Sequence, residues 1–579
     1  MGSNQDHHTK LGEFFATSIC GNDILSSVLY VSGIAAVFTG VFAPVVLLLV
    51  VGVLYLYKAV YTEAVEALPV NGGAYNCLLN ASSKMFASVA GVMTILSYIA
   101  TAVISAKVAI EYLHSIVSVP VIPATIVLLL VFALLVISGM KDSAKVASGI
   151  FIFHLITLAT FIVFGILYFL NNGIGEFMAN YSETLSTITE NGGLLPTLFF
   201  GFSASLLGVS GFESSANFVE DQKKGVFRKT LRNMLVGVAI FNPLIGLLVL
   251  NTLPMETIVI SKDFLLADAA LSLGGDMLKM LIVTDAFLVL SGAVLTAFVG
   301  VSGLMYRMAA DNCLPGLFTK VNKKGANPRI VIFFFVLCSS ILVLTGGDLL
   351  SLAGVYTISF LGVMTLFAFG NLLLKRSRPR LARTYRAPVI YAVLAGCATA
   401  AGIVGNIMID MNNLIFFLTY FIPALLVVFF YIYQEYSLNF LLSVTRRFKK
   451  INEYLYRRFD DAIDGNYLIF VKSAKKLFYA LDYLNKNEIG RNLYVVVCQK
   501  DLSDKNYQEV KDMLEMIEKS GLYEQYVIKL IHRQADFDPE TVAEISHELE
   551  IPANRILIGS IKEHHTFSYD ELGGVRIIF

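Results

Sequence analysis

The sequence predicts an α-helical protein that crosses a membrane many times and carries a small α/β domain behind its last crossing. Three observations support this prediction. The 579 residues are 56% apolar and only 15% charged, with a mean hydropathy of +0.69. Apolar segments of about 20 residues, the length of a membrane helix, recur from Ile24 to about Tyr433. From Asn466 onward, short apolar strands alternate with helical segments, which is typical of an α/β domain.

We therefore divide the chain into four parts and expect twelve membrane spans, an even number that returns the chain to its starting side. The parts are an N-terminal tail (1–15), a membrane domain (16–435), an amphipathic linker (436–465) and an α/β domain (466–579). The spans are expected near 24–38, 43–67, 85–113, 121–140, 146–170, 194–219, 234–250, 278–308, 330–344, 349–374, 389–409 and 414–433.

Charge distribution orients these spans and excludes several classes of function. Lys and Arg gather in alternate loops, for example at 223–232 and 375–386, so the positive-inside rule places both termini in the cytoplasm, on the inner side of the cell membrane. The 44 basic and 44 acidic residues balance, and no tract is basic enough to bind nucleic acid, so we expect lipid and small solutes as partners. The six scattered cysteines lack metal-ligand spacing, and no nucleophile lies beside a general base, so we predict neither a metal site of that kind nor an enzyme.

The first span carries a carboxylate and two hydroxyls, Asp23, Ser26 and Ser27, followed by Tyr30. A carboxylate at membrane depth persists when it faces a water-filled cavity, an ion or a partner, which makes Asp23 a candidate binding residue. The alternative is that Asp23 caps the helix at the membrane surface.

The sixth span is interrupted in a similar way, because the stretch 201–217 crowds glycine and serine around Ser210, Gly211 and Glu213. It lies five spans after the first. Two interrupted spans at corresponding places predict a transporter built from inverted repeats, with its site near the membrane centre. The alternative is that these glycines serve close helix packing.

Several motifs resemble the amino acid–polyamine–organocation superfamily of secondary transporters. They are Gly211–Asn217 followed by Glu220, Pro69–Tyr75, Met140–Lys145, Arg307–Pro315 followed by Pro328, and Arg378–Pro388. The resemblance covers about three quarters of the chain, with the motifs in the expected order. It implies the LeuT-type fold of two inverted five-helix repeats, with helices one and six broken and access that alternates between the two sides.

The first helix lacks the Gly-x-Gly break of many amino acid permeases and resembles that of the KUP and KimA-type potassium/proton symporters, which carry an Asp and a Tyr seven residues later. Carboxylate, phenol and hydroxyl oxygens suit an alkali cation. This resemblance implies a cation at Asp23, Tyr30, Thr101 and Glu213. The chain departs from it at Ser97, where these importers have an aspartate, and Gly-Phe-Glu runs are also general in amino acid permeases.

The third span contributes Ser97, Thr101 and Ser105, which recur every four residues and form one polar stripe, together with Tyr98. We include all four as candidate binding residues. For Ser105, ordinary helix packing is the simpler interpretation.

His154 lies on the fifth span at the spacing where some proton-coupled members of the superfamily carry a buried lysine. Imidazole titrates near neutrality, so we predict that His154, with Glu213, takes part in proton coupling. The alternative is a hydrogen-bonded packing histidine. Ser291 and Thr296 do not form the pair that sodium coupling would need, Asp285 is expected to pair with Lys279, and Lys107 with Glu111.

The α/β domain resembles the universal-stress-protein-like domain found behind KimA-type importers. Of the nucleotide-binding pattern only Gly559 and Ser560 are present, so we expect no tightly bound cofactor. As a hypothesis, the domain regulates transport by binding a nucleotide such as cyclic di-AMP, or by forming a homodimer.

These observations lead to one functional prediction with alternatives. We expect a proton-coupled secondary transporter that imports a small cationic solute, with potassium preferred. The alternative is an amino acid or polyamine permease, and a channel or a transport-inactive sensor is a third reading.

Overall fold

The computed structural model describes residues 10–578, apart from 70, 140–143, 191, 218, 220–221, 380, 382, most of 435–465, 489–491, 500–504, 522 and most of 560–574. The predicted linker 436–465, except Ser437 and Leu442, lies outside the described residues, as do Glu220 and Ser560. The chain divides into two units. One comprises 1–77, 89–307 and 316–424, and the other comprises 78–88, 308–315 and 425–579.

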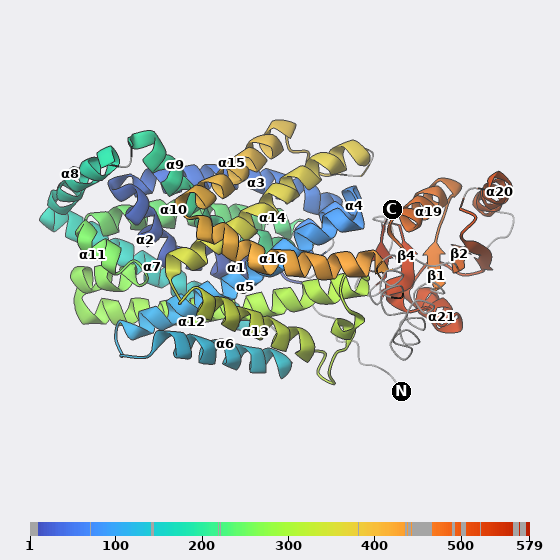
Figure 1. Ribbon diagram of the computed structural model, residues 1–579, viewed down its shortest axis with the longest axis horizontal. Helices are drawn as coiled ribbons and strands as arrows, with labels where there is room; N and C mark the ends of the chain where they lie inside the picture. The colour runs from blue at the N-terminus through green and yellow to red at the C-terminus, as the bar shows by residue number, and fades with distance from the viewer. Residues whose placement is uncertain are drawn as a thin grey trace. The chain divides into compact units, whose positions relative to one another are not determined.

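The first unit is helical (Figure 1). Among the described residues, nine helical segments are long and apolar enough to cross a membrane, and α6 and α13 are shorter apolar helices. The helices of the first half are α1 (Glu13–Ser26), α2 (Val28–Thr39), α3 (Ala43–Ala67), α4 (Gly73–Ala81), α5 (Lys84–His114), α6 (Val121–Ile137), α7 (Ala144–Asn172) and α8 (Gly175–Glu190). Those of the second half are α9 (Leu194–Ser205), α10 (Val226–Leu250), α11 (Met255–Ile260), α12 (Leu265–Ala310), α13 (Pro328–Leu344), α14 (Leu349–Ser377), α15 (Val389–Ile409) and α16 (Met411–Ile432).

The predicted number of twelve crossings requires the 55-residue segment 13–67 to cross twice and both shorter helices to cross once. The segment is about 80 Å long at 1.5 Å per residue, far more than one bilayer core. Two segments between predicted spans contain helices. Helix α8 occupies much of 171–191, and the first turns of α12, before its kink at Gly275, lie between the spans predicted at 234–250 and 278–308.

The two interrupted spans differ from one another. The sixth span is broken: α9 ends at Ser205, 3₁₀ turns follow at Leu206–Val209 and Glu213–Asn217, and Gly211 between them has φ +88°. The first span has only a one-residue interruption at Ser27, whose backbone stays helical (φ −61°, ψ −25°). The implied break of helix one is therefore slight, because no glycine is present there and the Ser27 hydroxyl donates to the Ile24 carbonyl at 2.6 Å, as in a regular helix.

Helix packing brings the two interrupted spans together. Helix α1 packs against α7 and α10, and α2 packs against α9. Further along the chain, α3 packs against α10 and α6 against α13. The residues around the interruptions of the first and sixth spans are thus buried among neighbouring helices rather than exposed on the outside of the bundle.

The second unit contains a five-stranded parallel sheet with the order β3-β2-β1-β4-β5 (Figure 1). Its strands are β1 (Asn466–Phe470), β2 (Asn492–Cys498), β3 (Val527–Arg533), β4 (Ile556–Ile558) and β5 (Arg576–Ile577). Helices α19 (Ala474–Asn487) and α20 (Lys505–Ser520) pack their leucine and valine side chains on one face of β1 and β2. Helix α21 (Pro539–Glu548) lies on the other side of the sheet (Figure 1).

Candidate functional site

A polar cluster forms where α1 meets the break of the sixth span. Asp23, 8% exposed, lies directly against Gly211: a Cβ atom on Gly211 would lie 2.8 Å from the carboxyl carbon of Asp23. This close approach leaves no room for a Cβ atom, and the positive φ of Gly211 also favours glycine at this position. The break therefore holds its backbone against a buried carboxylate.

A second carboxylate and two phenols complete the cluster. Glu213, Asp23, Tyr30 and Tyr356 interact electrostatically with one another. The carboxyl of Glu213 is within hydrogen-bonding reach of Ser97, while its Oε2 atom is buried without a hydrogen-bond partner among the described residues. Two acidic groups and several neutral oxygens thus share one buried volume.

Tyr356 on α14 was not predicted from the sequence. Its hydroxyl accepts a hydrogen bond from Thr101 at 2.8 Å and is also hydrogen-bonded to Ser210, so it joins α14 and α5 to the break. A signal was present in the sequence, since Tyr356, Thr357 and Ser359 place three hydroxyls within an otherwise apolar span.

The predicted hydroxyl residues differ in what they contact. Ser26 donates to the Asp23 carbonyl at 2.8 Å, and Ser27 also lies 3.3 Å from the Gly208 carbonyl in the break. The ring of Tyr98 packs against Gly300 on α12, and Ser105 is buried one turn beyond Thr101. Around the break the structure gathers Asp23, Ser27, Tyr30, Ser97, Thr101, Ser210, Gly211 and Glu213. Ser26 instead donates to a carbonyl of its own helix.

His154 forms a fully buried hydrogen-bonded pair with Asp285 of α12. The Nδ1 and Oδ2 atoms are 2.7 Å apart, both side chains are completely inaccessible, and the other atoms, Nε2 and Oδ1, have no hydrogen-bond partner among the described residues. This corrects the expectation that Asp285 pairs with Lys279, which lies 3.6 Å from Asp268 instead. Lys279 and Asp285 are six residues apart on α12 and so do not share a face of the helix. Helix packing instead places Asp285 against His154 of α7.

The His154–Asp285 pair lies beside the interrupted first span. Asn22 donates to the Ala147 carbonyl of α7 at 2.8 Å, and Gly21 lies against the ring of Phe151, one helical turn before His154. Tyr112 donates to the Leu29 carbonyl at 2.7 Å and interacts electrostatically with Asp285. On the same helix as Tyr112, Lys107 pairs with Glu111 at 3.1 Å, as expected, and also with Asp263.

Among the described residues, no group of three or more His, Cys, Asp or Glu side chains is placed to hold a metal ion. Ser291 is buried, and its hydroxyl has no hydrogen-bond partner among the described residues. Thr296 lies five residues further along α12, more than one helical turn away.

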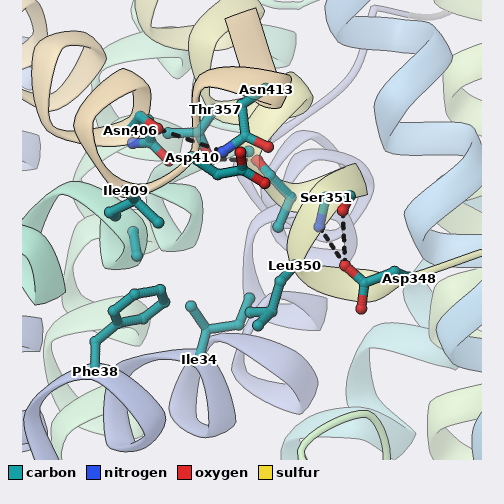
Figure 2. A pocket seen from close by; sticks show the side chains of 13 residues that line it. Ile34, Phe38, Asp348, Leu350, Ser351, Thr357, Asn406, Ile409, Asp410 and Asn413 are labelled. Atoms are coloured by element: carbon teal, nitrogen blue, oxygen red, sulfur yellow. Dashed lines mark hydrogen bonds between the residues drawn. The ribbon is translucent and has the colours of Figure 1, made fainter. Parts of the chain in front are cut away.

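A separate cavity of about 250 Å³ lies in the same unit and is shown in Figure 2. Thr357, which lines it, follows Tyr356, and Ala204, also in its wall, lies at the end of α9 just before the break. The remaining wall comes from α2, α14, α15 and α16. None of the residues of the polar cluster lines this cavity.

Comparison with known proteins identifies the family. A segment of 321 residues, 55% of this chain, is 23% identical to the branched-chain amino acid permease BcaP of Bacillus subtilis (strain 168), and covers 65% of that relative. The family model described as amino acid permease matches residues 11–432, which is well over half of the chain and includes the polar cluster, the His154–Asp285 pair and the cavity. The chain thus belongs to the amino acid permease family of multi-pass membrane transporters.

Proposed function

We propose that the protein is a proton-coupled permease for neutral, apolar amino acids. The family match and the relative's branched-chain substrate support the amino acid alternative, whereas the predicted preference for potassium has no support from them. The oxygen-rich cluster that suggested potassium also suits an ammonium group, which donates three charge-assisted hydrogen bonds to carboxylates and hydroxyls.

The observation that carries the proposal is the carboxylate of Asp23 held against Gly211 in the break of the sixth span. In this position Asp23, with Glu213 on the other side of Gly211, would receive the ammonium group of the solute. Tyr30, Thr101 and Tyr356 would limit the space around it. The branched-chain substrate named for the relative favours an apolar side chain on the solute.

Energy coupling is assigned to His154 and Asp285. When His154 carries a proton, the pair is neutral overall, and both partners can remain buried. When His154 loses the proton, Asp285 is left as a buried carboxylate without a countercharge, which is strongly unfavourable, so α7 and α12 have to rearrange or admit water. Tyr112 interacts electrostatically with Asp285 and also with Asp263 and Asp268. Glu213 remains a second candidate for the coupled proton.

Several finer predictions belong to the same proposal. The pairs α3 with α10 and α6 with α13 are those expected if the second five spans repeat the first five in inverted order, which supports the LeuT-type arrangement. The basic loops support cytoplasmic termini in a cell membrane. We propose that the parallel sheet behind the membrane domain regulates transport, through a nucleotide or through dimerisation.

The test is uptake into proteoliposomes under an imposed inward proton gradient, with labelled leucine, isoleucine and valine in one arm and rubidium in the other. We expect uptake of an amino acid above the level of empty liposomes, collapse of uptake by a protonophore, and loss of uptake in Asp23→Asn. The matched control is Asp276→Asn, which removes an exposed carboxylate at the kink of α12. Rubidium uptake without amino acid uptake would overturn the proposal in favour of potassium.

A further inference from the structure

The cavity shown in Figure 2 has a polar wall that carries amides and carboxylates but no cationic side chain. Asn406 and Asn413 lie on this wall. The amide nitrogen of Asn406 donates to the carbonyls of Ser203 (2.8 Å) and Gly402 (2.9 Å), and that of Asn413 lies 3.3 Å from the Asn406 carbonyl. Both amide donors of Asn406 and one of the two amide donors of Asn413 are therefore used within the protein.

Asn413 leaves an acceptor on this wall. Its side chain is only 3% exposed, and its Oδ1 atom has no hydrogen-bond partner among the described residues. The amide is seated against the bare backbone of Gly354, where an added Cβ would lie 2.2 Å from it. A buried carbonyl oxygen without a partner is costly, so its position on the cavity wall indicates a ligand that donates to it.

Two carboxylates give the same wall a negative charge. Asp348 accepts from the backbone and hydroxyl of Ser351, both at 2.8 Å, and Asp410 accepts from the backbone of Asn412 at 2.9 Å. These contacts cap the starts of α14 and α16, each of which carries about half a positive charge. The two carboxylate charges together exceed the partial positive charges of the two helix starts. None of the residues lining the cavity is Lys, Arg or His.

We propose that this cavity is a second binding site, specific for a primary ammonium group on an apolar body. The ammonium group would donate to Asn413 Oδ1 and to the carboxylate of Asp410, while the apolar part would lie on Ile34, Phe38 and Ile409. Helix capping explains the two aspartates but not the unpartnered Asn413 oxygen. A carboxylate ligand meets no Lys, Arg or His among the lining residues and faces two like charges. The assignment goes beyond the transport proposal and does not depend on which solute is carried.

The test is calorimetric binding to the purified full-length protein of three probes with the same branched body: 3-methylbutylamine, 3-methylbutanol and 3-methylbutanoate. We expect the amine to bind and the other two to bind at least tenfold more weakly. In the Asp23→Asn background, which removes the carboxylate of the central cluster, Asp410→Asn and Asn413→Leu should each weaken amine binding at least tenfold. Asn413→Asp, which keeps an acceptor, should retain it, as should the exposed control Asp276→Asn.

Asp23→Asn separates this cavity from the central cluster, because amine binding at the cavity should survive that substitution. The inference is overturned if the three probes bind alike, if adding Asp410→Asn or Asn413→Leu to Asp23→Asn leaves amine binding unchanged, or if Asp23→Asn alone abolishes binding. Failure of amino acid uptake in proteoliposomes would contradict the transport proposal and leave these binding results unaffected, so the two failures are distinguishable.

Discussion

Each of the two units contains a buried cluster of ionisable side chains, and the clusters differ in chemistry. In the first unit, His154 and Asp285 make one contact, and each keeps a second atom without a hydrogen-bond partner among the described residues. In the second unit, Glu488 accepts from Arg576 (2.6 Å), Lys84 (3.0 Å) and Tyr467 (2.9 Å). Both clusters are almost fully inaccessible to solvent, so exposure does not explain the difference between them.

In the second cluster, Glu488 and Arg576 each have several partners, and Glu488 remains ionised at neutral pH. Arg576 also donates to the Tyr483 hydroxyl at 2.8 Å, and its Nε atom lies 2.8 Å from Asp311, the residue after α12. Burial alone would raise the pKa of Glu488, but the charges of Arg576 and Lys84 and their hydrogen bonds outweigh it and lower the pKa to about 2. Arginine and lysine stay protonated at neutral pH, whereas histidine changes charge there. Thus the first pair is suited to a proton-dependent change and the second cluster to holding segments together.

The largest expected effect is on transport when the first pair is broken. His154→Gln or Asp285→Asn should reduce uptake driven by a proton gradient at least tenfold, because the pair can no longer exchange a proton. Exchange of labelled for unlabelled amino acid without a gradient should fall less and lose its pH dependence. Equal loss of both activities, with the protein folded, would mean that the pair is structural rather than coupling.

The next effect is on the stability of the second unit. Glu488→Gln leaves Lys84 buried without its countercharge and leaves Arg576 with Asp311 as its carboxylate partner. Removal of one partner from a buried ion pair costs about 3–5 kcal/mol. Hydrogen exchange of β1 and β2 in the full-length protein should rise accordingly. The control is Asp482→Asn, which breaks the exposed pair with Lys486 (2.8 Å) and should cost about 1 kcal/mol or less.

Acidification tests the same cluster without a mutation. Because the pKa of Glu488 is lowered from 4.5 to about 2, its contribution to stability is fully present above about pH 4.5 and is lost as pH falls toward 2. Protection of β1 against hydrogen exchange should decrease across that window in the parent chain. The part of this decrease that depends on Glu488 should be absent from Glu488→Gln, and an identical acid response in both proteins would contradict the assignment.

The smallest effect is expected from Tyr467→Phe, which removes one hydroxyl from Glu488 and leaves both cations in place. A hydrogen bond to a charged group contributes about 1.5–3 kcal/mol, so the loss should be smaller than that of Glu488→Gln. Thermal unfolding of the full-length protein, monitored in the second unit by hydrogen exchange, would measure it. A loss as large as that of Glu488→Gln would show that the cluster does not depend mainly on its charges.

Residues of the candidate site that lie on one helix were the most accessible to sequence reasoning. The stripe of Ser97 and Thr101 follows from helical periodicity, and both residues do lie at the cluster with Asp23 and Gly211. Tyr356 was missed because its role depends on α14 lying against α5. Asp285 was assigned to Lys279, a neighbour in sequence, whereas its partner His154 is 131 residues away.

By itself, the sequence determined that the chain is a multi-spanning helical protein with strands and helices behind it. The physical reason is local: in lipid the backbone must satisfy its hydrogen bonds within each helix, so long apolar segments identify the spans. Only the tertiary structure decided the partners of His154 and Glu488. Those contacts depend on the rotation and depth at which distant segments pack, and neither is set by the local pattern of any one segment.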